Sequence, residues 1–251
     1  MDQLPNLGRE QEMLDIMGIS SMKDLFEDIP VEIRSEGTLP LRPPQTEEEI
    51  LRDAQRLLGA NVDLDSRPSF ISAGLSRNFV PSMVPMIATR GEFLTSYTPY
   101  QPEVSQGMLQ AMWEFQTMIS ELVGLPISNV SMYDASTSAA EAITCAVRVK
   151  SKKVEMPNTV YVSELVPPHR MSVIENYTQG VGIDIRKIPH NEDGFLDLNS
   201  ATEASGSCAI YVEQPNAFGI LDEGLLKLRE VVGDKTAIIV GVDVTSLGIV
   251  E

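Results

Sequence analysis

The chain has 251 residues, of which 43% are hydrophobic and 22% are charged, so it can bury one large core or two small ones. This balance excludes intrinsic disorder and a collagen-like fibre. With 36 acidic and 19 basic side chains, the net charge is −17, which argues against a nucleic-acid partner because binding phosphates requires basic residues. No apolar stretch approaches the roughly 20 residues that cross a bilayer, so no membrane partner is expected.

The cysteines and histidines suggest neither a metal site nor a disulfide framework. Cys145 and Cys208 lack the paired spacing of zinc ligands, and we interpret them as two buried thiols in a reducing compartment. His169 and His190 share no metal-ligand spacing and are expected at the surface. The beginning of the chain has neither a basic flank nor an apolar run, as a secretory signal would. The sequence therefore predicts a cytoplasmic protein.

The first part of the chain is acidic and poor in core residues. Residues 1–66 hold 15 acidic and 6 basic side chains, which is more than half of the net charge. Ser21 and Thr46 each offer a side-chain oxygen to the start of a short helix, and Thr46 with Glu49 has the spacing of a capping box. A proline-rich linker over residues 35–45 separates the two helices. We predict that residues 1–66 form a helical N-terminal arm or cap, too small to hold a core.

A long irregular stretch precedes the first strong helix. Residues 69–102 are rich in proline, glycine and aromatic side chains without regular periodicity. Such a stretch inside a domain is usually functional or lies at an interface. From Leu109 to Leu122, apolar residues recur at helical spacing, and Gly124 ends the predicted helix.

Beyond position 130, strand-like and helical segments alternate. The expected strands cover residues 130–133, 159–163, 183–188, 208–212 and 237–242, and the expected helices cover residues 138–149, 168–179 and 221–232. Strands that alternate with helices imply crossover connections and a mainly parallel sheet. The last apolar run is typical of a strand buried on both faces. We therefore predict an incomplete α/β large domain over residues 67–251.

The densest group of polar and aromatic side chains lies at residues 95–107, just before the long helix. Pro99 and Pro102 fix the backbone there and hold the neighbouring polar side chains in place. This is the logic of a preorganised polar pocket. A rigid connector whose tyrosines merely pack is an equal alternative.

Two strand ends carry polar side chains that suit a ligand. The hydroxyls and free amides of residues 134–138 can cradle an anion, but an ordinary helix cap without a ligand is favoured. Ser138 and Glu141 have the spacing of the capping box that would open this helix. Asp243 follows the last apolar strand, where α/β proteins bind ligands, or it is only a carboxylate at a turn.

A long motif, Tyr97-Thr-Pro-Tyr-Gln-Pro-Glu-Val-Ser-Gln-Gly107, is accompanied by shorter ones along the chain. These lie at residues 17–21, 24–30, 91–95, 114–119, 131–134, 214–216 and 246–248. Together they resemble the glycine cleavage system P-protein family, in the form in which the enzyme is split into two subunits, and they follow the family order from one end of the chain to the other. The chain resembles the N-terminal half.

The resemblance implies a fold and an activity. The fold would be a fold-type-I pyridoxal-phosphate transferase-like (aminotransferase-like) large domain with a mainly parallel mixed sheet, preceded by a helical arm. The family decarboxylates glycine, releases CO2 and passes the aminomethyl group to the lipoyl arm of H-protein. The family chain is longer and would continue past Glu251, so its C-terminal remainder is expected to be absent here.

The resemblance also implies where the cofactor belongs. Pyridoxal phosphate is expected on the partner, subunit 2 of glycine dehydrogenase (decarboxylating), which supplies the Schiff-base lysine in an α2β2 heterotetramer. It is not expected covalently on this chain. Asp243 matches the acid that pairs with the pyridinium in fold-type-I enzymes. Ala135 stands where the family has glycine, and its β-carbon would crowd a phosphate, so the cofactor site of this chain is expected to be degenerate.

By the same resemblance, five side chains of the long motif are expected to line the mouth of an active site across the subunit interface. They are Tyr97, Thr98, Tyr100, Glu103 and Gln106. Two hypotheses remain: an enzyme component that supplies these residues to its partner, or a non-catalytic scaffold that stabilises the partner and docks H-protein. An independent pyridoxal-phosphate lyase or aminotransferase is disfavoured, because Lys150, Lys152 and Lys153 lie in a polar run unsuited to a Schiff base.

Overall fold

The computed structural model describes residues 5–35, 37, 39–64, 66–68, 78–151 and 156–249. The chain divides into two compact units, Met1–Pro68 and Ser69–Glu251, and each is described by itself. In these described ranges, no helix combines the length and the apolar character that crossing a membrane requires.

The first unit consists of short helices joined by extended segments. They are α1 (Glu10–Met17), the 3-10 helices η1 (Met22–Phe26) and η2 (Val31–Ile33), and α2 (Glu47–Leu58). As predicted, Ser21 caps η1, and Thr46 caps α2 in a capping box in which the Thr46 amide donates to Glu49 Oε2 at 2.8 Å. Leu14 is the one buried apolar side chain in the described part of this unit, which therefore has no core of its own there.

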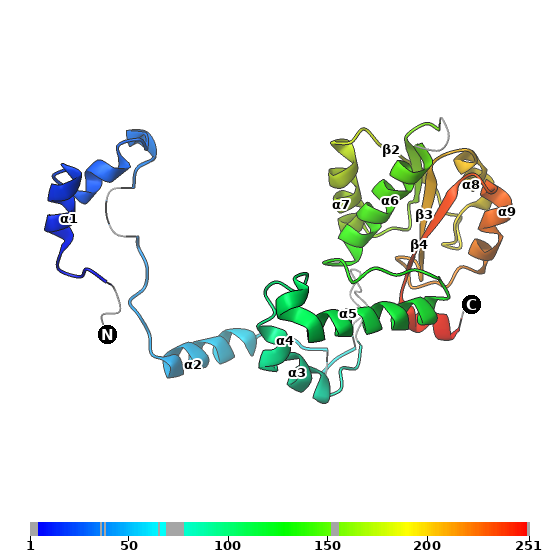
Figure 1. Cartoon of the computed structure of the whole chain (residues 1–251). Helices are drawn as coiled ribbons and strands as arrows, with labels where there is room; N and C mark the ends of the chain where they lie inside the picture. Colours follow the sequence, from blue (N-terminus) through cyan, green and yellow to red (C-terminus); the bar gives the residue numbers. More distant parts are fainter. Residues whose placement is uncertain are drawn as a thin grey trace. The chain divides into compact units, whose positions relative to one another are not determined.

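The second unit is built on a parallel sheet, as the alternating pattern predicts (Figure 1). Its strands are β1 (Thr159–Ser163), β2 (Asp184–Ile188), β3 (Ala209–Gln214) and β4 (Ala237–Val242), in the order β2-β1-β3-β4. All three pairings are parallel. β1 and β3 lie in the middle of these four strands, and every residue of both is buried.

Helices cover both faces of the sheet (Figure 1). α6 (Ala135–Ser151) and α7 (Pro168–Gln179) pack on one face, and α8 (Leu198–Ala201), η3 (Thr202–Ala204), η4 (Glu223–Lys227) and α9 (Leu228–Val232) on the other. Successive strand side chains point to opposite faces. On β3, Tyr211 belongs to the core under α6 and α7, whereas Ile210 and Val212 belong to the core under α8 and α9.

The remaining helices of this unit are α3 (Met83–Ala88), α4 (Gly91–Leu94), α5 (Pro102–Val123) and the 3-10 helix η5 (Val244–Gly248). α5 begins at Pro102 and ends at Gly124, which adopts a left-handed conformation. Ser105 interrupts its helical geometry and is its one buried residue. Trp113 of this helix is 73% exposed.

The structure corrects several local predictions. Residues 130–133 form no strand, because they lack a neighbouring strand to pair with in the described sheet and lead directly into α6. The stretch predicted to be irregular contains α3 and α4, and residues 69–77 lie outside the described residues. Cys208 is buried as predicted, but Cys145 is exposed. β4 is only partly covered, because it pairs with β3 on one side and no described strand lies on its other side.

Gly241 of β4 should not tolerate a side chain. A β-carbon there would lie 2.5 Å from the Tyr211 hydroxyl and 3.2 Å from Glu213 Cγ, and both side chains are buried. We expect Gly241→Ala to lower the free energy of unfolding by about 1–3 kcal/mol, as overpacking does. Gly180→Ala is the matched control, because a β-carbon at Gly180 meets nothing within 4 Å. Urea unfolding of both variants checks the prediction, and equal stability would contradict it.

Candidate functional site

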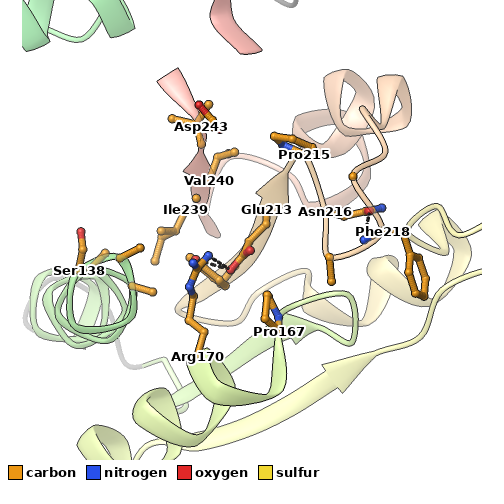
Figure 2. Close-up of a pocket in the computed structure, with 18 residues that line it drawn as sticks. Ser138, Pro167, Arg170, Glu213, Pro215, Asn216, Phe218, Ile239, Val240 and Asp243 are labelled. Carbon is orange, nitrogen blue, oxygen red and sulfur yellow. Dashed lines mark hydrogen bonds and ion pairs between the residues drawn. The ribbon is translucent and has the colours of Figure 1, made fainter. Parts of the chain in front are cut away.

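A cavity of about 670 Å³ lies at the carboxyl ends of β3 and β4. Figure 2 shows its lining: Ser138 comes from the start of α6, Arg170 from the start of α7, Glu213 from β3 and Asp243 from the end of β4. The carboxyl edge of a parallel sheet is where α/β proteins place their ligands, because loops and helix starts converge there. This position makes the cavity the first candidate for a binding site.

A buried ion pair crosses the cavity wall. Arg170 Nη1 lies 2.5 Å from Glu213 Oε1, and the two side chains are only 15% and 6% exposed. The Tyr211 hydroxyl donates to the same Glu213 oxygen at 3.0 Å. The Arg170 Nε atom is buried and has no hydrogen-bond partner among the residues that the structure describes. The Glu213 carboxylate therefore has two partners, whereas the Arg170 guanidinium uses only part of its hydrogen-bonding capacity.

Burial and the neighbouring charges shift the pKa values of Tyr211 and Arg170. Burial raises the pKa of Tyr211, and the neighbouring Glu213 carboxylate raises it further, because both oppose a phenolate. Burial alone lowers the pKa of Arg170, but the Glu213 carboxylate and Tyr211 outweigh it, so the net shift is upward. Tyr211 thus remains a neutral hydrogen-bond donor and Arg170 a cation.

The rim of the cavity next to β3 is held by side-chain amides. Asn216 Oδ1 accepts hydrogen bonds from the amides of Phe218 and Ile220 at 2.9 and 3.2 Å, and Asn216 Nδ2 donates to the Gly194 carbonyl at 2.9 Å. The Asp222 amide donates to Gln214 Oε1 at 3.0 Å. These bonds fix the loop after β3, so the rim is rigid rather than a mobile flap.

Asp243 lies at the end of β4, as the sequence predicts, and lines the cavity. Its Oδ1 atom accepts from the Thr245 hydroxyl at 2.6 Å and from the Thr245 amide at 3.0 Å. These bonds lower the pKa of Asp243, in that order of effect. Asp243 is therefore a carboxylate at the cavity mouth and also the cap of η5.

The start of α6 differs from the prediction. The helix begins at Ala135, three residues before the predicted capping residue Ser138, whose amide already donates to the Asp134 carbonyl at 3.0 Å within the first turn. Asp134 makes the cap: its Oδ1 atom accepts from the Thr137 amide at 2.7 Å. Ser138 is exposed and lines the cavity instead. Residues 134–137 thus form a helix cap, as one of the two interpretations of residues 134–138 predicts.

The five residues predicted from the long motif lie together, but not in this cavity. Tyr97, Thr98 and Tyr100 belong to the loop before α5, and Glu103 and Gln106 belong to the first turns of α5. None of them is among the residues that line the cavity. Tyr97 is 92% and Tyr100 73% exposed, so neither tyrosine packs as a connector residue would.

This loop is held by hydrogen bonds although its tyrosines are exposed. The Ser105 hydroxyl, which is buried at the kink of α5, donates to the Thr98 carbonyl at 3.0 Å. The Gln101 amide donates to the same carbonyl at 3.1 Å. Pro102 occupies the first turn of α5, where its missing amide proton costs nothing. The loop therefore holds its polar side chains outward in a fixed geometry.

The Arg170–Glu213 pair and the role of Tyr211 are not predicted from the sequence. One local signal was available: Glu213 is a charged residue inside the run Ala209-Ile-Tyr-Val-Glu-Gln214 of a central strand, and a buried acid requires a partner. Nothing in the local pattern identifies that partner, because Arg170 lies 43 residues earlier on a different element.

A parallel sheet between two helical layers, with a cavity at its carboxyl edge, belongs to the same class of α/β architecture as the large domain of fold-type-I pyridoxal-phosphate enzymes. Residues 5–251 match the model of the glycine cleavage system P-protein family. The chain belongs to this family, whose members depend on pyridoxal phosphate.

Sequence and structure comparisons agree with this assignment. The chain is 44% identical over 250 residues to the probable glycine dehydrogenase (decarboxylating) subunit 1 of Thermococcus onnurineus, covering 99% of this chain and 54% of that protein. It is 40% identical over 255 residues to the protein of the same name from Saccharolobus solfataricus, covering 99% and 55%. The chain therefore spans about half the length of the curated relatives it matches.

Among solved structures, the chain is similar to an inhibitor-bound crystal structure of glycine decarboxylase, the P-protein of the glycine cleavage system. The TM-score is 0.76 at 36% sequence identity, and the match covers 100% of this chain and 55% of that one. The similarity confirms the predicted fold class and the predicted family.

The cavity does not fit the cofactor of the family. No lysine is among the described lining residues, so nothing there can form a Schiff base. Arg170 is the one cation among these residues, and Glu213 already neutralises it. Asp243 suits a pyridinium nitrogen, but a carboxylate alone does not hold a phosphorylated ligand.

The buried ion pair should behave as a unit in unfolding experiments. Removing one partner leaves an uncompensated buried charge, so Arg170→Met and Glu213→Leu should each lower the free energy of unfolding by about 3–5 kcal/mol. The double variant should be much less destabilised than the sum of the two, because it buries no charge. Urea unfolding of the three variants measures this coupling. Additive losses would show that the two side chains contribute independently.

Proposed function

We propose that the chain is one subunit of a glycine-decarboxylating enzyme of the glycine cleavage system. With its partner, subunit 2 of glycine dehydrogenase (decarboxylating), it decarboxylates glycine and passes the aminomethyl group to the lipoyl arm of H-protein, with release of CO2. The pair forms an α2β2 heterotetramer in the cytoplasm. Pyridoxal phosphate is bound by the partner. The poor fit of the cofactor to the cavity of this chain supports that assignment.

The role of this chain is to supply Tyr97, Thr98, Tyr100, Glu103 and Gln106 to the active site of the partner. The observation that carries this proposal is the loop before α5, which is fixed by Ser105 yet directs its tyrosines away from its own core. A side chain that is held in place and lacks an internal partner is available to a substrate bound on another chain. In the apposed partner, these groups would orient glycine at the mouth of the site.

A scaffold without catalytic residues is the second candidate. The exposed apolar side chains of α5 favour it, because such a face is typical of a subunit interface: Val104, Trp113, Met118 and Leu122 are all more than half exposed. In this case the chain would stabilise the lysine-bearing partner and dock H-protein, and the tyrosines of the loop would contribute only to assembly.

Substitutions in the loop test the proposal. In the complex reconstituted from the full-length subunits, Tyr97→Phe or Gln106→Ala should lower glycine decarboxylation by roughly 10- to 100-fold, the range expected when a positioned reactant loses its alignment. Exchange of labelled bicarbonate into glycine measures the activity. Both side chains are exposed, so the thermal stability of the isolated chain should not change.

Matched substitutions outside the loop are the controls. Tyr177→Phe and Gln179→Ala change the same residue types at the end of α7 and should leave the activity intact. Size-exclusion chromatography of each complex then separates the two candidates. Lost activity with intact assembly supports a contribution to the active site. Activity that falls only together with assembly supports the scaffold, and unchanged activity overturns the site assignment.

A further inference from the structure

We infer that Ser105 is a positioning residue for the proposed reaction, because its hydroxyl sets how the loop before α5 lies against the rest of that helix. The inference rests on the proposed function and adds a residue to it, since Ser105 is not one of the five side chains proposed to act on the partner. Ser105 is only 8% exposed, so its role is to hold its neighbours rather than to touch a substrate.

Ser105 lies at the joint between two groups of the proposed site residues. Tyr97 and Tyr100 belong to the loop before α5, whereas Gln106 directly follows Ser105 in the helix. The backbone of Ser105 departs from helical geometry, with φ −144° and ψ 30°, so the first turn of α5 and the remainder of the helix are two segments joined by a kink. Whatever fixes Ser105 therefore fixes how the two tyrosines lie relative to Gln106.

The Ser105 hydroxyl makes a hydrogen bond across this joint. It donates to the Thr98 carbonyl, seven residues earlier in the chain, at 3.0 Å. The same carbonyl accepts from the Gln101 amide at 3.1 Å, and the Val104 amide donates to the Gln101 carbonyl at 3.2 Å. These three bonds connect the loop to the kink. Only the hydroxyl bond is made by a side chain, so a substitution at Ser105 removes it and leaves both backbone donors and acceptors in place.

The burial of Ser105 is what gives this bond its effect. Among the 22 residues of α5, all of them described, Ser105 is the one that is buried, and residues 101–104 and 106–107 on either side of it are exposed. An exposed hydroxyl exchanges its acceptor for water at little cost, whereas a buried hydroxyl that loses its acceptor is left without a partner. The bond to the Thr98 carbonyl is therefore the persistent contact that holds an otherwise exposed loop.

Hydrogen exchange in the full-length chain tests this hold without a partner or a substrate. Ser105→Ala should raise the exchange rate of the amides in residues 98–104 by about five- to tenfold, as the loss of one net hydrogen bond implies. Ser105→Thr keeps the hydroxyl and should restore slow exchange. Ser207→Ala is the matched control, because Ser207 is also buried and donates to the Ala204 carbonyl at 2.7 Å, but lies before β3. It should leave exchange in residues 98–104 unchanged.

The turnover of the complex reconstituted from the full-length subunits tests the consequence for the reaction. Ser105→Ala should lower kcat for exchange of labelled bicarbonate into glycine by about tenfold and change KM for glycine by less than about twofold, because a loosened loop misaligns glycine that is already bound. Ser105→Thr should recover most of the lost kcat. Ser207→Ala should retain the wild-type kcat, although it loses a comparable buried hydrogen bond.

Faster loop exchange together with a lower kcat in Ser105→Ala alone supports the inference. Unchanged exchange in folded Ser105→Ala, checked by circular dichroism, would overturn it, as would equal losses of kcat in Ser105→Ala and Ser207→Ala. Faster exchange with an unchanged kcat would also overturn it, and Tyr97→Phe then shows what else fails. If Tyr97→Phe is fully active, the proposed contribution of the loop to the partner falls too. If Tyr97→Phe is impaired, the proposed function stands and only the role of Ser105 is lost.

Discussion

The burial of Glu213 is the constraint on which the candidate cavity depends. A carboxylate buried near the end of a central strand is costly unless it is paired, and Arg170 provides the pairing from the first turn of α7. The pair therefore fixes how the start of α7 lies against the end of β3. Tyr211 donates to the same carboxylate and lies over Gly241, so the neighbouring strand β4 has no room for a side chain at that position.

One consequence of this pairing is that the charged groups of the cavity already have partners within the chain. Glu213 pairs with Arg170, and Thr245 bonds to Asp243. A ligand that binds there must compete with bonds the chain already makes, and a phosphorylated one also meets net negative charge. The position of the cavity in the fold alone would make it the candidate active site. The charged groups that line it, however, do not suit a phosphorylated ligand.

Much of the sheet could be predicted from the sequence, because β-branched and apolar runs between glycines and prolines mark strands locally. Thr159–Ser163 and Ala237–Val242 form strands with the predicted bounds. The start of α6 was predicted wrongly because Asp134 and Ser138 are both good capping residues, and the local pattern does not choose between them. The Arg170–Glu213 pair could not be predicted, because it depends on how α7 packs against β3.

The polar side chains around the cavity bond within the chain, whereas those of the loop before α5 are exposed. Around the cavity, Glu213 pairs with Arg170, and one buried Arg170 nitrogen has no partner among the described residues. In the loop, the internal hydrogen bonds involve the Thr98 carbonyl and leave the exposed tyrosines free of the core. Exposed groups on a loop that is held in place are available to an external molecule. This physical difference, rather than the location of the cavity, is why the loop is the stronger functional candidate.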